Sequence, residues 1–179
     1  MDALLTWTLS AIREEGASAS WLEERRYDWV PLAGEVIPRI LEGAPVIIAT
    51  DTPRSWFGRY ILSAVNRSGR NRPLLPFVAI EGILPEFFLW QSESELELVQ
   101  EMLNMALPNH FFWYIGRGDD ARARLAKRRD DTFLWLIDEE APNSFYLRSA
   151  DEQLDNKLLT LYRLFEKSLE AALFGEIGV

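Results

Sequence analysis

The polar residues best placed to do chemistry follow a short, strongly apolar run. Thr50, Asp51, Thr52 and Ser55 come after Val46–Ala49, which is too short for a helix and rich in β-branched residues. Such a run is typical of a strand buried on both faces, and the helix after a parallel strand can hold a phosphate at its N-terminus. Here, however, the loop has no glycine to bring backbone amides close, and Asp51 would repel a phosphate. We interpret these polar residues as a helix cap and a turn.

A second polar loop, Gly116–Asp120, follows the apolar run Phe111–Ile115 and reads G-R-G-D-D. Paired carboxylates such as Asp119 and Asp120 can hold Mg²⁺ or share a proton. At the start of a helix they more often offset the helix dipole. We interpret them in this second way.

The only histidine, His110, precedes a predicted strand, at the end opposite to the usual ligand site, and no nucleophile elbow accompanies it. After the second loop comes a basic run that we interpret as a solvated helix face: Arg122, Arg124, Lys127, Arg128 and Arg129. No catalytic constellation assembles. The sequence therefore predicts a protein that is not an enzyme and has no resident metal or cofactor.

The elements that position these loops alternate between strand and helix. Thr52 is the predicted N-cap of a helix with Pro53 at its first position and an apolar stripe reaching Val65. A turn around Gly69 leads into a second strand, 74–80. A strand, helix and strand of this length form a right-handed βαβ unit, so the sheet is parallel and needs helices on both faces. Further strands are predicted at 111–115, 132–137 and 144–147.

Helical patterns account for much of the remaining chain. They predict helices at 2–15, around Trp21, at 28–41, from Ser92 or Ser94 to about 107, at 121–129 and at 151–174. The segment 81–90 is predicted to be a loop with an exposed aromatic cluster of Phe87, Phe88 and Trp90. The predicted fold class is α/β: a Rossmann-like three-layer α/β/α sandwich around a central, mainly parallel sheet of four to five strands.

Length and composition set further bounds. The 179 residues predict one domain, with N-terminal helices in 1–43, an α/β core in 44–150 and a long C-terminal helix in 151–175. There are no cysteines, which excludes disulfides and is compatible with a reducing cytoplasm. No apolar run reaches the roughly 20 residues of a membrane span, and the N-terminus lacks a basic signal region. We therefore expect a cytoplasmic protein.

The net charge and the last predicted helix both indicate which kinds of partner the protein binds. The net charge of −9 argues against direct contact with nucleic acid but permits a basic protein partner. The helix at 151–174 has an apolar stripe that Leu159 and Leu164 widen beyond one core face. A helix with this pattern usually packs against both its own sheet and a neighbouring subunit. The sequence thus predicts an oligomer.

Seven short strings occur in order over nearly the whole chain: S-W-L-E at 20–23, W-F-x-x-Y-I-L-S at 56–63, R-P-L-L at 72–75, F-W at 112–113, F-L-W-L at 133–136, L-D-x-K-L-L-x-L-x-x-L-F-E at 154–166 and A-L-F at 172–174. Together with the βαβ unit they resemble the sugar-isomerase (SIS) fold, especially the phosphoheptose isomerase branch. They resemble more closely the HobA family of SIS-like proteins, which bind the replication initiator DnaA.

The resemblance implies a homotetramer of Rossmann-like subunits that binds the N-terminal domain of DnaA. By holding several DnaA molecules together, such a protein promotes their ordered assembly at the chromosomal origin without any chemistry of its own. Ala49 and Asp51 occupy positions where isomerases have glycine, and 151–174 lacks the histidine that isomerases place in the last helix. A sugar-phosphate binder or isomerase is the alternative function, and a purely structural oligomer is a third.

The resemblance also carries over a partner site. In initiator-binding relatives the apolar end of the last helix contacts DnaA, and the matching residues here are Leu173 and Phe174. An aromatic residue and a leucine on an exposed turn are plausible interface anchors. Alternatively, the two residues complete the core of the tetramer.

Overall fold

The computed structural model describes residues 2–86 and 92–178, so the predicted aromatic cluster of Phe87, Phe88 and Trp90 lies outside the described residues. The chain forms two compact units. One comprises residues 42–147 and the other comprises residues 1–41 together with 148–179. The arrangement of the chain as a single domain stays a prediction.

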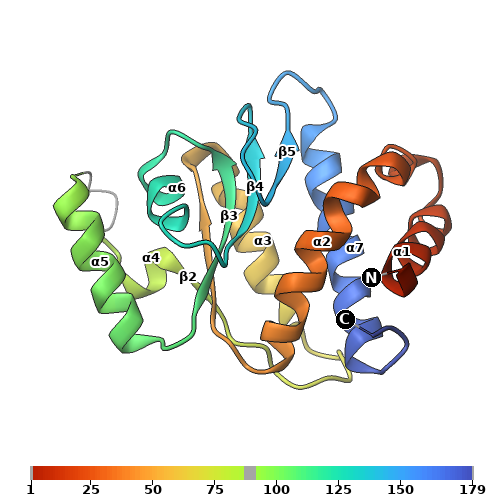
Figure 1. Cartoon of the computed structure of the whole chain (residues 1–179), viewed down its shortest axis with the longest axis horizontal. Helices are drawn as coiled ribbons and strands as arrows, with labels where there is room; N and C mark the ends of the chain where they lie inside the picture. The colour runs from red at the N-terminus through yellow and green to blue at the C-terminus, as the bar shows by residue number, and fades with distance from the viewer. Residues whose placement is uncertain (1, 87–91, 179) are drawn as a thin grey trace. The chain divides into compact units, whose positions relative to one another are not determined.

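The unit 42–147 is built on a five-stranded sheet in the order β2-β1-β3-β4-β5 (Figure 1). All four pairings between neighbouring strands are parallel, which confirms the predicted parallel sheet. The strands are β1 (Val46–Thr50), β2 (Phe77–Ala79), β3 (Phe111–Arg117), β4 (Phe133–Ile137) and β5 (Ser144–Leu147). As expected for a sheet covered on both faces, every residue of β1 and β4 is buried.

The predicted strand at 74–80 is too long, because β2 covers only Phe77–Ala79. Pro73 and Pro76 have no N–H to donate to a strand ladder. The backbone N–H of Leu75 is engaged elsewhere, since it donates to the side-chain oxygen of Asn66 at 2.9 Å. The strand therefore begins only after the second proline.

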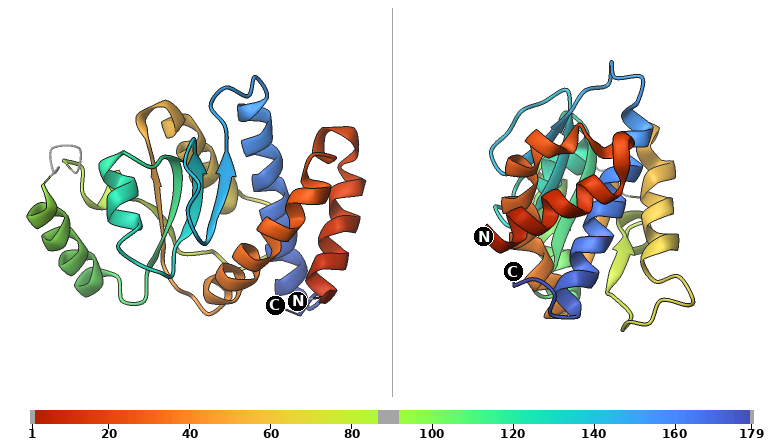
Figure 2. Two further views of the ribbon diagram at one scale, coloured as in Figure 1. Left: turned by 45° about the horizontal axis from the view of Figure 1, so that its top comes forward. Right: turned by 90° about the vertical axis from the view of Figure 1, so that its right-hand side faces the viewer.

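Helices cover both faces of this sheet, which gives the predicted three layers (Figure 2). On one face lies α3 (Ser55–Val65), preceded by the 3₁₀ turn η2 (Thr52–Arg54), and the ring of Phe57 lies 6.1 Å from that of Trp135. The other face carries α4 (Ile80–Ile83), α5 (Glu93–Ala106) and α6 (Ala121–Ala126). Their apolar side chains join those of alternate strand residues in one buried cluster.

Two predicted bounds on this second face are wrong. The segment 81–90 begins with the last residues of α4 instead of a loop, and α6 ends at Ala126 before the end of the basic run. The N-cap of α5 is confirmed as Ser92, whose side chain forms a reciprocal capping box with Glu95.

The other unit consists of helices. They are α1 (Asp2–Glu14), the 3₁₀ turn η1 (Gly16–Ala19), α2 (Leu22–Leu41) and α7 (Leu154–Leu173), and α1, α2 and α7 contact one another (Figure 2). The prediction of separate helices around Trp21 and at 28–41 is wrong, because α2 runs through both Pro31 and Pro38. Its buried side chains form a continuous stripe from Trp29 to Ile40, and such packing offsets the loss of backbone bonds at the prolines.

Within the part of the chain that the structure describes, no helix combines the length and the apolar character needed to cross a membrane.

Candidate functional site

The loop after β1 is organised by Asp51. Its backbone is extended, with φ −68° and ψ 167°, and its Oδ1 accepts the N–H of Arg54 at 3.2 Å. The prediction that Thr52 caps the helix is therefore wrong: Asp51 is the cap, and Thr52 is the first residue of η2. A carboxylate on an extended residue can reach the free amides of the first turn, which explains why Asp51 and not Thr52 is the cap. Pro53 lies in that first turn, as predicted.

The carboxylate of Asp51 also joins two strand ends. Its Oδ2 accepts the N–H of Arg117, at the end of β3, at 2.8 Å, and forms an ion pair with the guanidinium of Arg54. Asp51 and Arg54 are 3% and 8% exposed, so this ion pair is largely shielded from water. Gly116 permits the approach, because its φ of +154° disfavours a side chain and a Cβ there would lie 2.6 Å from the Cγ of Asp51.

Tyr114 completes this buried polar cluster. Its hydroxyl donates to the carbonyl oxygen of Arg117 at 2.6 Å. Burial raises the pKa of Tyr114 strongly, and the negative charges of Asp120 and Asp51 raise this pKa further. The phenol therefore stays neutral and acts as a hydrogen-bond donor, not as a base.

These contacts decide what the loop can bind. In an open parallel sheet, the amides at the start of the helix after a strand are the usual cradle for a phosphate. Here the amides of Arg54 and Arg117 are already bonded to the carboxylate of Asp51. Asp51 thus supplies from within the chain the negative charge that a phosphate would bring, in agreement with the predicted cap and turn.

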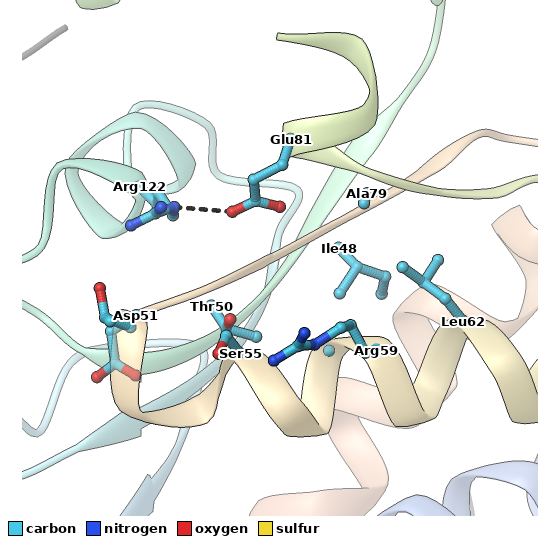
Figure 3. A pocket seen from close by; sticks show the side chains of 11 residues that line it. Ile48, Thr50, Asp51, Ser55, Arg59, Leu62, Ala79, Glu81 and Arg122 are labelled. Carbon is cyan, nitrogen blue, oxygen red and sulfur yellow. Dashed lines mark hydrogen bonds and ion pairs between the residues drawn. The ribbon is translucent and has the colours of Figure 1, made fainter. Parts of the chain in front are cut away.

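Next to this loop lies a cavity of about 400 Å³ (Figure 3). Apolar side chains such as Ile48 and Leu62 line part of it, and Arg59 and Arg122 stand on different elements around it. The Nε of Arg122 pairs with Glu81 at 3.1 Å and its Nη1 with Asp120 at 3.4 Å. The positive charge of Arg122 is therefore already balanced by carboxylates.

The acidic pair of the second loop has divided roles. The Oδ1 of Asp120 accepts the N–H of Arg122 at 2.8 Å and caps α6. Asp119 is 83% exposed at its side chain and lies 4.0 Å from the Nε of Arg117. The interpretation of the pair as charges at a helix start is confirmed for Asp120. In residues 2–86 and 92–178, no three histidine or carboxylate side chains converge in a group that could hold a metal.

His110 is buried next to the start of β3, away from this loop. Its Nδ1 lies 2.8 Å from the carbonyl oxygen of Leu107, and its ring meets that of Phe112 edge to face at 5.5 Å. A packing role fits this position.

The basic run on and after α6 is not the solvated face that we expected, and this interpretation is wrong. Each of its five side chains is at most 39% exposed and has an acidic partner: Arg122 with Glu81, Arg124 with Glu93, Lys127 with Glu139, Arg128 with Glu93 and Glu97, and Arg129 with Asp131. The pairs with Glu93 and Glu97 connect α6 and the turn after it to α5. The sequence could not show this, because the acids lie about 30 residues away in the chain.

The predicted partner residues lie in the helical unit. Leu173 is the last residue of α7 and is half-buried, whereas Phe174 is 61% exposed. Phe174 lines a cavity of about 380 Å³ together with Trp7 of α1 and with Lys167 and Glu170 of α7. The contribution of Trp7 could not be predicted from the sequence, because this residue belongs to an ordinary amphipathic helix.

Similarity to known proteins extends over the whole length of the chain. Residues 1–179 match the family model described as "HobA: DNA replication regulator". A protein of Helicobacter pylori (strain ATCC 700392 / 26695), "DNA replication regulator protein HobA", is 28% identical over 183 residues, which cover 99% of each chain.

Solved structures give the same result. The chain aligns with HobA in a crystal structure of a HobA–DnaA (domain I–II) complex from Helicobacter pylori with a TM-score of 0.79 and 27% identity, covering 97% of both chains. With a crystal structure of HobA from Helicobacter pylori the TM-score is 0.76 at 27% identity, covering 97% of this chain and 98% of the other.

Proposed function

Because the chain belongs to the HobA family of DNA replication regulators, we propose that it binds the N-terminal domain of the replication initiator DnaA. As a homotetramer it would then promote ordered assembly of DnaA at the chromosomal origin. The observation that carries the proposal is the match over 97% of both chains, with a TM-score of 0.79, to HobA in a complex with domains I–II of DnaA. The likeness covers both units of this chain and is not limited to the common α/β sheet.

The proposed mode of action is non-enzymatic and cytoplasmic. The protein brings several DnaA molecules together and so raises their effective concentration. A net charge of −9 supports regulation through DnaA instead of direct contact with DNA. The internal carboxylate of Asp51 supports the absence of a sugar-phosphate reaction, because it engages the amides that such a substrate would need.

We place the DnaA contact at the end of α7. Phe174 is the more exposed of the two predicted anchors, and its cavity offers both an apolar wall from Trp7 and charged groups from Lys167 and Glu170. Aromatic anchors beside a recess are typical of residues that dominate binding free energy. The alternative is that Leu173 and Phe174 pack between subunits.

The deciding experiment is a calorimetric titration of the intact chain with the isolated domains I–II of DnaA from the same organism, with light scattering on the same samples. We expect saturable binding of one DnaA fragment per subunit, on a particle of about four subunits. No heat and no mass increase at concentrations of roughly 50 µM would overturn the proposal.

A variant separates the two roles of Phe174. With Phe174→Ala, we expect affinity for DnaA to fall at least about tenfold while the particle mass is unchanged. Phe174→Leu keeps an apolar side chain and serves as the matched control, with a smaller loss. If Phe174→Ala instead lowers the particle mass, the residue belongs to the subunit interface.

The alternative function is tested in the same preparation. A sugar phosphate that binds the folded protein must raise its melting temperature. We expect no shift at millimolar sugar phosphate, and a shift that depends on ligand concentration would favour the sugar-phosphate binder.

A further inference from the structure

Large apolar side chains are unevenly distributed over the surface. Among the described residues, seven of them are exposed, and five belong to the α/β unit: Tyr60, Leu74, Leu98, Met102 and Met105. These five come from two places, α3 with the loop that follows it, and α5. Exposed apolar groups gathered in this way mark interaction surfaces.

The first place, which we call the α3 face, combines apolar and basic side chains. Arg59, Tyr60 and Arg67 share one side of α3 and its end, and all three are exposed. The side chains of Arg59 and Arg67 form no ion pair within the described residues. Residues 52–80 hold five arginines and no Asp, Glu or Lys, so this stretch is strongly basic within a chain whose net charge is −9. Tyrosine and arginine are the residue types that most often dominate protein interfaces.

Leu74 extends the α3 face and is held in a fixed position. It is 82% exposed, yet the loop on both sides of it is tied to the end of α3. The side-chain amide of Asn66 donates to the carbonyl oxygen of Leu75 at 2.8 Å and accepts the N–H of Leu75 at 2.9 Å. Arg72 donates to the carbonyl oxygen of Val65 at 2.6 Å. Because the loop is already ordered, little conformational entropy is lost when Leu74 enters a partner.

The second place, which we call the α5 face, is apolar and acidic. Leu98, Met102 and Met105 recur at i, i+4 and i+7, so they form one outward stripe, while Leu96, Val99 and Leu103 point into the core. Helix α5 contains four glutamates and no basic residue. Glu101 borders the stripe, and its side chain has no ion-pair partner in the described part of the chain.

The two faces flank the same edge of the sheet. β2 is an edge strand that pairs only with β1 among the described strands. Helix α3 contacts β2 from one face, and Val78 of β2 packs on the other face against the cluster that contains the buried side of α5. A free strand edge with apolar groups on both sides is a surface that proteins normally cover.

We propose that the occupant is a second copy of this chain, with the α3 face of one copy on the α5 face of the other. The charges of the two faces favour this pairing. If two α3 faces met, their arginines would repel one another, and if two α5 faces met, their glutamates would do so. An α3 face on an α5 face instead brings Arg59 and Arg67 close to acidic groups. Since both faces flank β2, a two-fold axis beside this edge forms the contact twice. This contact would be one interface of the homotetramer in the proposed function. It depends on the proposed function only in assuming that the chain forms a tetramer.

Disulfide trapping tests the pairing directly, because the natural chain contains no cysteine. Leu74→Cys and Met102→Cys are introduced together into one chain, with each single variant and a Tyr27→Cys/Met102→Cys pair as controls. We expect mild oxidation to trap covalent dimers of the Leu74→Cys/Met102→Cys chain, and peptide mapping to find the bond between Cys at 74 and Cys at 102. The proposal would be overturned if no disulfide-linked dimer formed, or if the control variants were trapped to the same extent.

Charge reversal provides the second test. Arg59→Glu and Glu101→Lys are each expected to raise the dissociation concentration of the oligomer about tenfold, measured by sedimentation in a dilution series. The two changes in one chain re-create opposite charges and should restore most of the association. Melting temperatures confirm that the variants fold, which is expected since both side chains are exposed. No effect of either single change would overturn the pairing.

The same variants keep this inference separable from the DnaA proposal. Each is also titrated with domains I–II of DnaA. If the charge variants dissociate the oligomer but still bind one DnaA fragment per subunit, the pairing holds and the DnaA site lies elsewhere. If the wild type binds no DnaA but its oligomer is broken by these variants, only the proposed function fails.

Discussion

The carboxylate of Asp51 lies against the backbone of Gly116, so closely that a Cβ on Gly116 would be 2.6 Å from its Cγ and 2.8 Å from its Oδ2. Asp51 is the residue after β1, and Gly116 lies next to the last residue of β3. Asp51 cannot simply turn away, because it bonds the amides of Arg54 and Arg117. The pair therefore fixes how the ends of the two central strands meet.

We expect Gly116→Ala to destabilise the protein by about 2 to 3 kcal/mol, because the new methyl group overlaps Asp51 and the backbone φ of +154° is strained for alanine. Urea unfolding measures the change. The control is Gly82→Ala in α4, where the nearest side-chain atom is 4.0 Å from the new Cβ. The control should be neutral or slightly stabilising, and equal losses in both variants would contradict the role of the close approach.

Asp51→Asn should cost about 3 kcal/mol, because it leaves the buried guanidinium of Arg54 without a carboxylate. Replacing both partners, in Asp51→Asn/Arg54→Met, is expected to cost less than the single change, since no unpaired charge then remains buried. Urea unfolding of the wild type, Asp51→Asn, Arg54→Met and the double variant gives the coupling free energy between the two side chains. Additive losses would show that the two side chains act independently.

Tyr114 gives a pH-dependent prediction. Its pKa is raised above the ordinary value of 10.0 in the folded protein, so its contribution to stability is complete below pH 10 and declines as pH rises further. Tyr114→Phe should cost about 1 kcal/mol at neutral pH through the lost bond to Arg117. Above pH 10 this difference should shrink, and then reverse, by up to about 1.4 kcal/mol per pH unit. A difference that stays constant between pH 8 and pH 11 in urea unfolding would contradict this account.

The ion pairs between α5 and α6 should be weak and sensitive to salt. Glu93 pairs with both Arg124 and Arg128, but its side chain is 65% exposed. We expect Glu93→Gln to lower stability by at most about 1 kcal/mol at low salt and to have no effect near 1 M NaCl. Glu140→Gln, at an exposed position without an ion-pair partner among the described residues, is the control and should be neutral at both salt concentrations.

The sequence was informative where the pattern is local. The buried runs of β1, β3 and β4 and a serine cap at position 92 or 94 could be predicted because each depends on neighbouring residues. The strand after the RPLL string was predicted too long, because apolar residues alone do not show that Leu75 bonds the side chain of Asn66. The prediction of two helices where the structure has α2 was wrong for a similar reason. The buried stripe is continuous, and its packing keeps the segment helical through Pro31.

The candidate site depended more on contacts that are distant in sequence. Asp51 was recognised as unfavourable for phosphate, but its bond to Arg117 spans 66 residues and has no local signature. Likewise, the basic residues on and just after α6 form ion pairs with acids of α5 that are distant in the sequence. The absence of acids from residues 52–80 was a visible signal of the α3 face, although composition alone does not show which arginines are exposed.

The helical unit draws its residues from both ends of the chain, 1–41 and 148–179, and this has a consequence for synthesis. On the ribosome, α1 and α2 emerge first, but α7 emerges only after all residues of the sheet. At roughly 5–20 residues per second, the wait lasts about 5 to 20 s. During this time the apolar side chains of α1 and α2 lack the helix that they contact in the finished unit. A nascent chain stalled before residue 154 therefore presents these helices to chaperones and to other nascent chains.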